Sequence, residues 1–176
     1  MNKGKRFKVF SNRGAHIRDI MGDLICVADE NSICRQCVKS IFLVCGGNDT
    51  EGLHGERGVM DIISRYATLL DYTGFIFPSA RVNIISLIPR RLRYYNHLRY
   101  MIIVNDNLSN LCNERDNCRF INVFSHYLRD KKSFFRYKHA MILNEKLYAN
   151  DKLHFSNIGN SVLGKIIKGV TYNPRS

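Results

Sequence analysis

Two short stretches near opposite ends of the chain hold polar residues of the types and spacing that acid–base chemistry uses. Asp151 and His154 are three residues apart, just ahead of a segment whose first residues favour the start of a helix. A carboxylate beside an imidazole orients the ring, and the imidazole can then act as a general base. The alternative is a surface aspartate and a half-buried histidine that only precede a terminal amphipathic helix.

The other stretch is IFLVCGGNDT, from Ile41 to Thr50. Four apolar residues run into two glycines and then Asn48 and Asp49, a pattern typical of a buried parallel strand that ends in a tight turn. Ligands of open α/β sheets bind outside the carboxyl ends of the strands, so these two polar residues are candidates for a site. The competing interpretation is that Gly46 and Gly47 only allow the chain to reverse.

Strands and helices are predicted to alternate along the whole chain. Apolar runs predict strands over 39–45, 80–89 and 118–124, and helical spacing predicts helices over 14–27, 59–72 and 93–113, with a last helix capped by Ser156. Ile25 and Ile158 are expected on inward faces, and Cys26 and Cys45 in the core. This alternation predicts an α/β protein of one domain, residues 1–176, as a three-layer α/β/α sandwich with a mostly parallel sheet.

The two polar stretches resemble sequence blocks of one superfamily. Gly46-Gly47-Asn48-Asp49 is similar to the G-x-N-D block, and Asp151-Lys152-Leu153-His154 to the D-x-x-H block, of the SGNH (GDSL-like) hydrolases. The segment KVFSNRGAHIRDI, from Lys8 to Ile20, looks like the second block of that family, with a strand, a loop that carries Gly14 and a helix that begins near His16. The three blocks occur in the family's order.

The resemblance implies an ester hydrolase with a serine nucleophile and a flavodoxin-like sheet of strand order 2-1-3-4-5. His154 would be the base and Asp151 its orienting partner. Gly14 and Asn48 would donate to the oxyanion, with Gly46, Gly47 and Asp49 forming the supporting turn.

The family's first block, which carries the serine, has no counterpart here. Only thirteen residues precede Gly14, and their one serine, Ser11, lies in the same loop as the glycine. If residues 5–10 form the family's second strand, the neighbouring strand with the serine is missing as well. We therefore expect an N-terminally shortened chain that is inactive as written, or one that rebuilds this edge of the sheet in another way.

The charge balance supports a second hypothesis. Lys and Arg number 27 against 15 Asp and Glu, which gives a formal net charge of +12 and a pI near 9.6. Such an excess favours contact with polyanions, so the alternative function is a non-catalytic SGNH-like domain that binds nucleic acid or another polyanion. The charges concentrate in residues 3–8, 90–99 and 129–138; Arg90, Arg91 and Arg93 would ring the crevice and hold an anionic substrate, or remain solvated.

The cysteines bear on metal binding and redox chemistry, and the hydropathy bears on the location of the chain. Cys34 and Cys37 form a C-x-x-C that zinc or redox chemistry can use, but no second pair has finger-like spacing, and we expect reduced thiols. We predict no metal and no cofactor. No apolar run reaches the length of a membrane span and the start lacks a signal-peptide core, so a cytoplasmic or nuclear location is expected for the chain as given.

Overall fold

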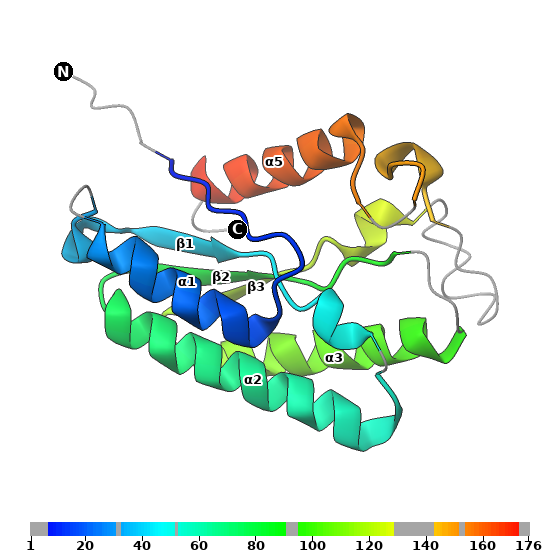
Figure 1. Cartoon of the computed structure of the whole chain (residues 1–176), viewed down its shortest axis with the longest axis horizontal. Coiled ribbons are helices and arrows are strands. Elements are labelled where there is room, and N and C mark those ends of the chain that lie inside the picture. Colours follow the sequence, from blue (N-terminus) through cyan, green and yellow to red (C-terminus); the bar gives the residue numbers. More distant parts are fainter. Residues whose placement is uncertain are drawn as a thin grey trace.

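Within the part of the chain that the structure describes, the central sheet has three parallel strands (Figure 1). They are β1 (Ser40–Leu43), β2 (Arg81–Ile85) and β3 (Cys118–Ile121), in the spatial order β1-β2-β3. Each is shorter than its apolar run in the sequence. The computed structural model describes residues 7–30, 33–51, 53–90, 95–128, 143–151 and 154–172.

Helices cover both faces of this sheet. Helices α1 (Ile17–Asp29), α2 (Gly55–Ile76) and α3 (Tyr95–Asn113) lie on one face, and α5 (Asn157–Tyr172) lies on the other (Figure 1). The alternation of side chains along β2 explains the two layers. Val82 and Ile84 are buried with the three helices, whereas Ile85 is buried in the cluster that includes α5. The predicted three-layer α/β/α sandwich is confirmed.

The N-terminal segment differs from its prediction. Residues 7–10 form no strand, and Phe7 and Val9 expose 54% and 90% of their surface. Among the described residues, β1 pairs with β2 on one side only, and the segment passes β1 as a coil (Figure 1). An extended segment needs a neighbouring strand for its backbone hydrogen bonds, and residues 7–10 have no such partner in the sheet.

Three predicted core positions are wrong. Helix α1 buries Ile17, Leu24 and Ala28, which leaves Ile25 44% exposed on the next face of the helix and Cys26 exposed as well. In α5 the residues that pack on the sheet include Val162 and Leu163, whereas Ile158 in the first turn is 58% exposed. Helical spacing alone does not fix how wide the buried stripe is.

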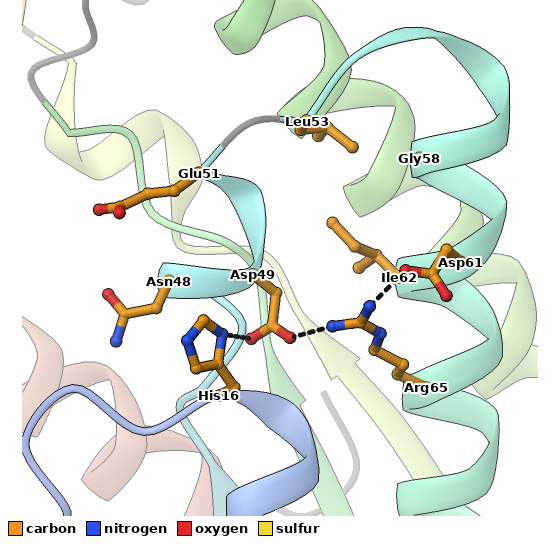
Figure 2. Close-up of a pocket in the computed structure, with 9 residues that line it drawn as sticks. All are labelled: His16, Asn48, Asp49, Glu51, Leu53, Gly58, Asp61, Ile62 and Arg65. Carbon is orange, nitrogen blue, oxygen red and sulfur yellow. Dashed lines mark hydrogen bonds and ion pairs between the residues drawn. The ribbon is translucent and has the colours of Figure 1, made fainter.

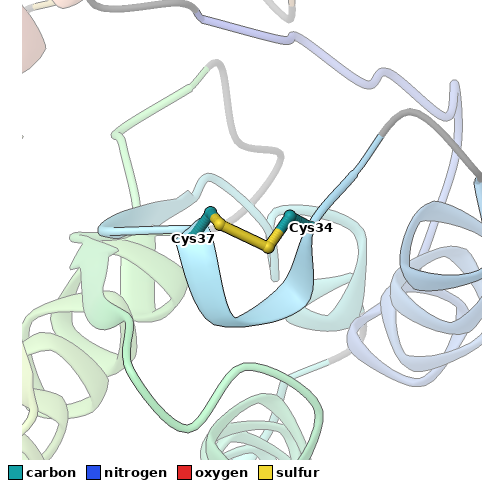
Figure 3. The surroundings of a disulfide bond; sticks show 2 residues. All are labelled: Cys34 and Cys37. Atoms are coloured by element: carbon teal, nitrogen blue, oxygen red, sulfur yellow. A yellow bond between two sulfur atoms is a disulfide. The ribbon is translucent and has the colours of Figure 1, made fainter.

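The expectation of reduced thiols is wrong for one pair. Cys34 and Cys37 are joined by a disulfide, with their Cα atoms 5.1 Å apart (Figure 3). Cys34 precedes the single 3₁₀ turn η1 (Arg35–Cys37) and Cys37 ends it, and the Cys37 N–H donates to the Cys34 carbonyl at 2.9 Å. This turn brings the two side chains together just before β1. Cys26, Cys45, Cys112 and Cys118 are free.

The basic segments lie largely outside the described residues. This holds for residues 3–6, for Arg91 and Arg93, and for 129–138. Arg99 is exposed on α3, and Arg90 is half-buried. Within the described ranges, no helix combines the length and the hydropathy that crossing a membrane requires.

Candidate active site

Glycine is required where β1 ends. Gly46 has a φ of +86°, and a Cβ placed on it would lie 2.3 Å from the hydroxyl oxygen of Tyr66. That hydroxyl donates to the Cys45 carbonyl at 2.7 Å. Burial raises the pKa of Tyr66 well above its usual value, so the phenol remains a neutral donor. The turn after β1 is therefore packed tightly against α2.

Asp49 connects the turn to two helices (Figure 2). Its side chain is fully buried and accepts hydrogen bonds from the Ile17 N–H at 2.9 Å and from Arg65 Nη1 at 3.0 Å. His16 Nδ1 lies 3.6 Å from the same carboxylate. Burial acts to lower the pKa of Arg65, and the hydrogen bonds to Asp49 and Asp61 outweigh it, so this pKa is raised. Asp49 thus holds the start of α1 against the turn and α2.

Asn48 is the polar side chain that the turn presents. It opens the 3₁₀ turn η2 (Asn48–Thr50) and is half-buried. Its Nδ2 donates to the Ala15 carbonyl at 3.1 Å, and its Oδ1 accepts from Arg90 Nη1 at 3.3 Å. The second hydrogen on Nδ2 remains available to a ligand.

Arg90 holds this amide in place. Its side chain is only 14% exposed and also donates through Nη2 to the Gly47 carbonyl and to Glu51. Burial lowers the pKa of the guanidinium, and Glu51 opposes this shift. Of the arginines expected around the crevice, Arg90 is the one within the described residues, and it contacts the turn directly.

Gly14 lies on the loop that meets Asn48. It has a φ of +78°, is exposed, and an added Cβ would meet nothing within 4 Å. The next residue, Ala15, supplies the carbonyl that Asn48 contacts. The structure therefore brings the two predicted oxyanion donors onto adjoining segments.

Asp151 and His154 form a close pair. His154 Nδ1 and Asp151 Oδ2 are 2.6 Å apart, and the His154 backbone N–H donates to Asp151 Oδ1 at 3.0 Å. The His154 side chain is 61% exposed and the Asp151 side chain is 45% exposed. Tyr148 and Phe155 form an antiparallel bridge that closes the loop, and the Ala149 N–H donates to the His154 carbonyl at 2.8 Å.

Two further contacts fix this loop to the molecule. Ser156 Oγ accepts from the Gly159 N–H at 3.2 Å, so the predicted helix cap of α5 is confirmed. The buried Tyr148 hydroxyl donates to the carbonyl of Pro89, the residue before Arg90. The loop that carries His154 is thereby linked, through Pro89 and Arg90, to Asn48 at the carboxyl end of the sheet.

A cavity of about 240 Å³ opens beside the turn, on the side of α2 (Figure 2). Its lining combines polar groups near the turn with two apolar side chains, and comprises His16, Asn48, Asp49, Glu51, Leu53, Gly58, Asp61, Ile62 and Arg65. Neither Asp151 nor His154 is part of this lining. The cavity shares Asn48 and Asp49 with the candidate site.

Several supporting residues escaped the sequence analysis. Tyr66 lies at helical spacing among apolar residues, which is typical of a core position, and Arg65 beside it has the appearance of a surface charge. Tyr148 lies among polar and charged residues without a clear pattern. Only Arg90 was expected near the site, because it directly follows the second predicted strand.

Comparison with known proteins rests on structure. No protein-family model and no curated protein matches the chain. A protein from Streptococcus pneumonia, described as a platelet activating factor, superposes with a TM-score of 0.70 at 19% identity, over 95% of this chain and 73% of its own. A protein from Bacteroides fragilis, described as an acylhydrolase, superposes with a TM-score of 0.65 at 11% identity, over 92% of this chain and 72% of its own.

These likenesses establish the fold. The chain shares the α/β fold of these two proteins, which agrees with the fold that the resemblance to the SGNH (GDSL-like) hydrolases implied. At such low identities the likeness does not extend to activity.

Proposed function

We propose that this domain hydrolyses acyl esters by a Ser-His-Asp mechanism, with a serine that the chain as written does not supply. The observation that carries the proposal is the 2.6 Å contact between His154 Nδ1 and Asp151 Oδ2. With Nδ1 directed at the carboxylate, Nε2 is the nitrogen that exchanges protons with a substrate or nucleophile. The fold shared with a protein described as an acylhydrolase supports hydrolysis of an acyl group as the reaction class.

The chemical steps follow from these positions. The serine hydroxyl attacks the acyl carbonyl while His154 Nε2 takes its proton, and Asp151 stabilises the imidazolium. The oxyanion of the tetrahedral intermediate accepts hydrogen bonds from the Gly14 N–H and from Asn48 Nδ2. His154 then protonates the leaving alcohol, and water releases the acyl group by the same route in reverse.

Arg90 has a positioning role in this scheme. Because it donates to Asn48 Oδ1, the amide cannot rotate to present its oxygen to the oxyanion without breaking that hydrogen bond. An oxygen in that place would repel the developing negative charge. The buried guanidinium also adds positive charge behind the amide.

We assign the missing serine to a strand that adds to the free edge of β1. Two observations support this assignment. Within the described residues β1 has a partner on one side only, and the N-terminal segment passes β1 as a coil in which Phe7 and Val9 are exposed (Figure 1). In the 2-1-3-4-5 order, β1, β2 and β3 take the last three places, and the serine-bearing strand adjoins β1. Without this strand the polypeptide is inactive.

The test uses the protein as its native host produces it, with its intact mass and N-terminal sequence determined. A mass above 20.4 kDa, with a serine after the additional strand, is expected together with covalent labelling by a fluorophosphonate probe. His154→Ala should abolish labelling. His54→Ala is the matched control, because His54 is an exposed histidine just before α2 and has no role in the mechanism. A native protein of 20.4 kDa that begins at Met1 and stays unlabelled would overturn the proposal.

A further inference from the structure

Two thiols meet at the corner between α3 and β3, away from the candidate active site. Cys112 lies on the last turn of α3 and Cys118 is the first residue of β3. Their sulfur atoms are 2.9 Å apart, and both are free cysteines. A disulfide has an S–S distance of about 2.05 Å, so a movement of less than about 1 Å separates the pair from a bond.

The turn between the two cysteines holds them in this arrangement. The Arg115 N–H donates to the Cys112 carbonyl at 3.1 Å, and the Cys118 N–H donates to the Arg115 carbonyl at 3.1 Å. The Arg115 guanidinium donates to the Leu111 carbonyl at 3.1 Å and forms an ion pair with Asp71 on α2 at 3.0 Å. The proximity of the thiols is therefore part of the packed corner.

The two sulfurs differ in reactivity. The hydrogen bond with Cys112 lowers the pKa of Cys118, and nearby Arg115 acts in the same direction, whereas burial opposes them. The same hydrogen bond, together with burial, raises the pKa of Cys112. Cys118 is half-buried and Cys112 is 2% exposed. The greater exposure of Cys118 fits an attacking thiol, and the burial of Cys112 fits a resolving thiol.

The other cysteines lack this combination. Cys34 and Cys37 are already bonded to each other. Cys26 is exposed, and no cysteine is recorded in contact with it among the described residues. Burial raises the pKa of Cys45 to about 12, which leaves its thiol protonated and unreactive.

We propose that Cys112 and Cys118 form an oxidation site at which a small peroxide converts the dithiol into a disulfide. The Cys118 thiolate attacks one oxygen of hydrogen peroxide, the O–O bond breaks, and Cys118 becomes a sulfenic acid, while the departing hydroxide takes up the proton that the thiol lost and leaves as one water. The Cys112 sulfur then attacks the sulfenic sulfur, its proton leaves with the hydroxyl as a second water, and the S–S bond forms. Two thiols are oxidised and one peroxide is reduced to two waters.

The geometry selects a small oxidant. Because Cys118 is half-buried and Cys112 is 2% exposed, the site favours a small oxidant such as a peroxide over the thiol of a second protein. The product would link α3 to β3 through a short loop and restrict the unfolded chain.

The experiment starts from fully reduced protein, freed of reductant, and titrates it with hydrogen peroxide. Trypsin cuts after Arg115, so a bond between Cys112 and Cys118 joins two peptides into one species that reduction separates. We expect this species at low peroxide, before Cys26 is oxidised, and a thermal midpoint that rises by a few degrees. In Cys118→Ser protein the linked species should be absent and Cys112 should remain a thiol.

Two variants keep the result unambiguous. Cys26→Ser is the matched control and should leave the linked species unchanged. Cys34→Ser/Cys37→Ser removes exchange with the existing disulfide, and the linked species should still form in it. Oxidation of Cys118 to a sulfinic acid without a linked peptide, or a bond between Cys112 and any other cysteine, would overturn the proposal.

Discussion

The two halves of the candidate site are built in opposite ways. The turn after β1 is anchored through a buried carboxylate on Asp49, a close approach of Gly46 to Tyr66, and a buried arginine against Asn48. The loop before α5 carries an aspartate and a histidine that are 45% and 61% exposed, and it is joined to the sheet end through the Tyr148 hydroxyl at Pro89. The polar side chains of the first half are held by buried contacts, whereas those of the second half face solvent.

This difference separates what each half contributes. Donors to an oxyanion must be placed before the charge develops, and a rigid turn meets that need. A general base must exchange protons with substrate and water, which an exposed imidazole can do. We therefore expect substitutions in the turn to cost stability and substitutions in the loop to cost chemistry.

The largest loss of stability is expected from Asp49→Ala. The substitution leaves the Ile17 N–H and Arg65 without their shared acceptor at a buried position, so the free energy of unfolding should fall by about 2–3 kcal/mol. Urea denaturation followed by circular dichroism measures this. Asp61→Ala removes the other carboxylate partner of Arg65. Because the Asp61 side chain is 57% exposed, this substitution should cost less than about 0.5 kcal/mol. Equal losses in the two variants would contradict the assignment of Asp49 as the anchor.

Gly46→Ala tests the close approach of the turn to α2. The added methyl would meet the Tyr66 hydroxyl, and the backbone has a positive φ, so a loss of about 2–3 kcal/mol is expected. Gly14→Ala is a matched control with a similar φ of +78° but open space around the new methyl, and should cost only about 1 kcal/mol. Chemical denaturation of both proteins measures the difference, which vanishes if only the backbone conformation matters.

Much of the fold could be predicted from the sequence because its signals are local. Apolar runs located all three strands, and helical spacing located α1, α2, α3 and α5 to within a few residues, except that α2 extends further at both ends. The segment 7–10 was expected as a strand because the family resemblance implied one, yet a strand requires a pairing neighbour, which this segment lacks within the described residues. The Cys34–Cys37 bond depended on a turn geometry that the spacing alone left open.

In the candidate site, too, local contacts could be predicted from the sequence and long-range contacts could not. Asp151 and His154 are three residues apart, so their contact could be predicted from spacing. The contacts of Arg90 with Asn48 and of Tyr148 with Pro89 join residues 42 and 59 positions apart. No periodicity in the sequence encodes such pairs, because they depend on how separate loops meet at the end of the sheet.

Tyr148→Phe tests the connection between the two halves. Loss of the buried hydroxyl should lower the free energy of unfolding by about 1 kcal/mol and shift the NMR signals of the His154 ring, because the loop loses its contact with Pro89. Tyr127→Phe also removes a buried hydroxyl, one that donates to the Gly159 carbonyl at 2.9 Å, and should cost a similar amount. A smaller shift of the His154 signals in that control is expected. Equal shifts in both variants would mean that the link through Pro89 does not position the loop.

Asp151→Ala is expected to have the smallest effect on stability. The carboxylate is 45% exposed and its partner His154 is 61% exposed, so water can replace the lost hydrogen bonds, and the free energy of unfolding should change by no more than about 0.5 kcal/mol. Urea denaturation beside Asp49→Ala makes the comparison direct, since both variants remove one aspartate of the candidate site. A loss of 2 kcal/mol or more would show that Asp151 serves mainly to hold the loop, the structural role that an aspartate before a helix commonly has. A negligible loss would argue against that structural role, and is the result expected if the carboxylate 2.6 Å from His154 serves to orient the imidazole.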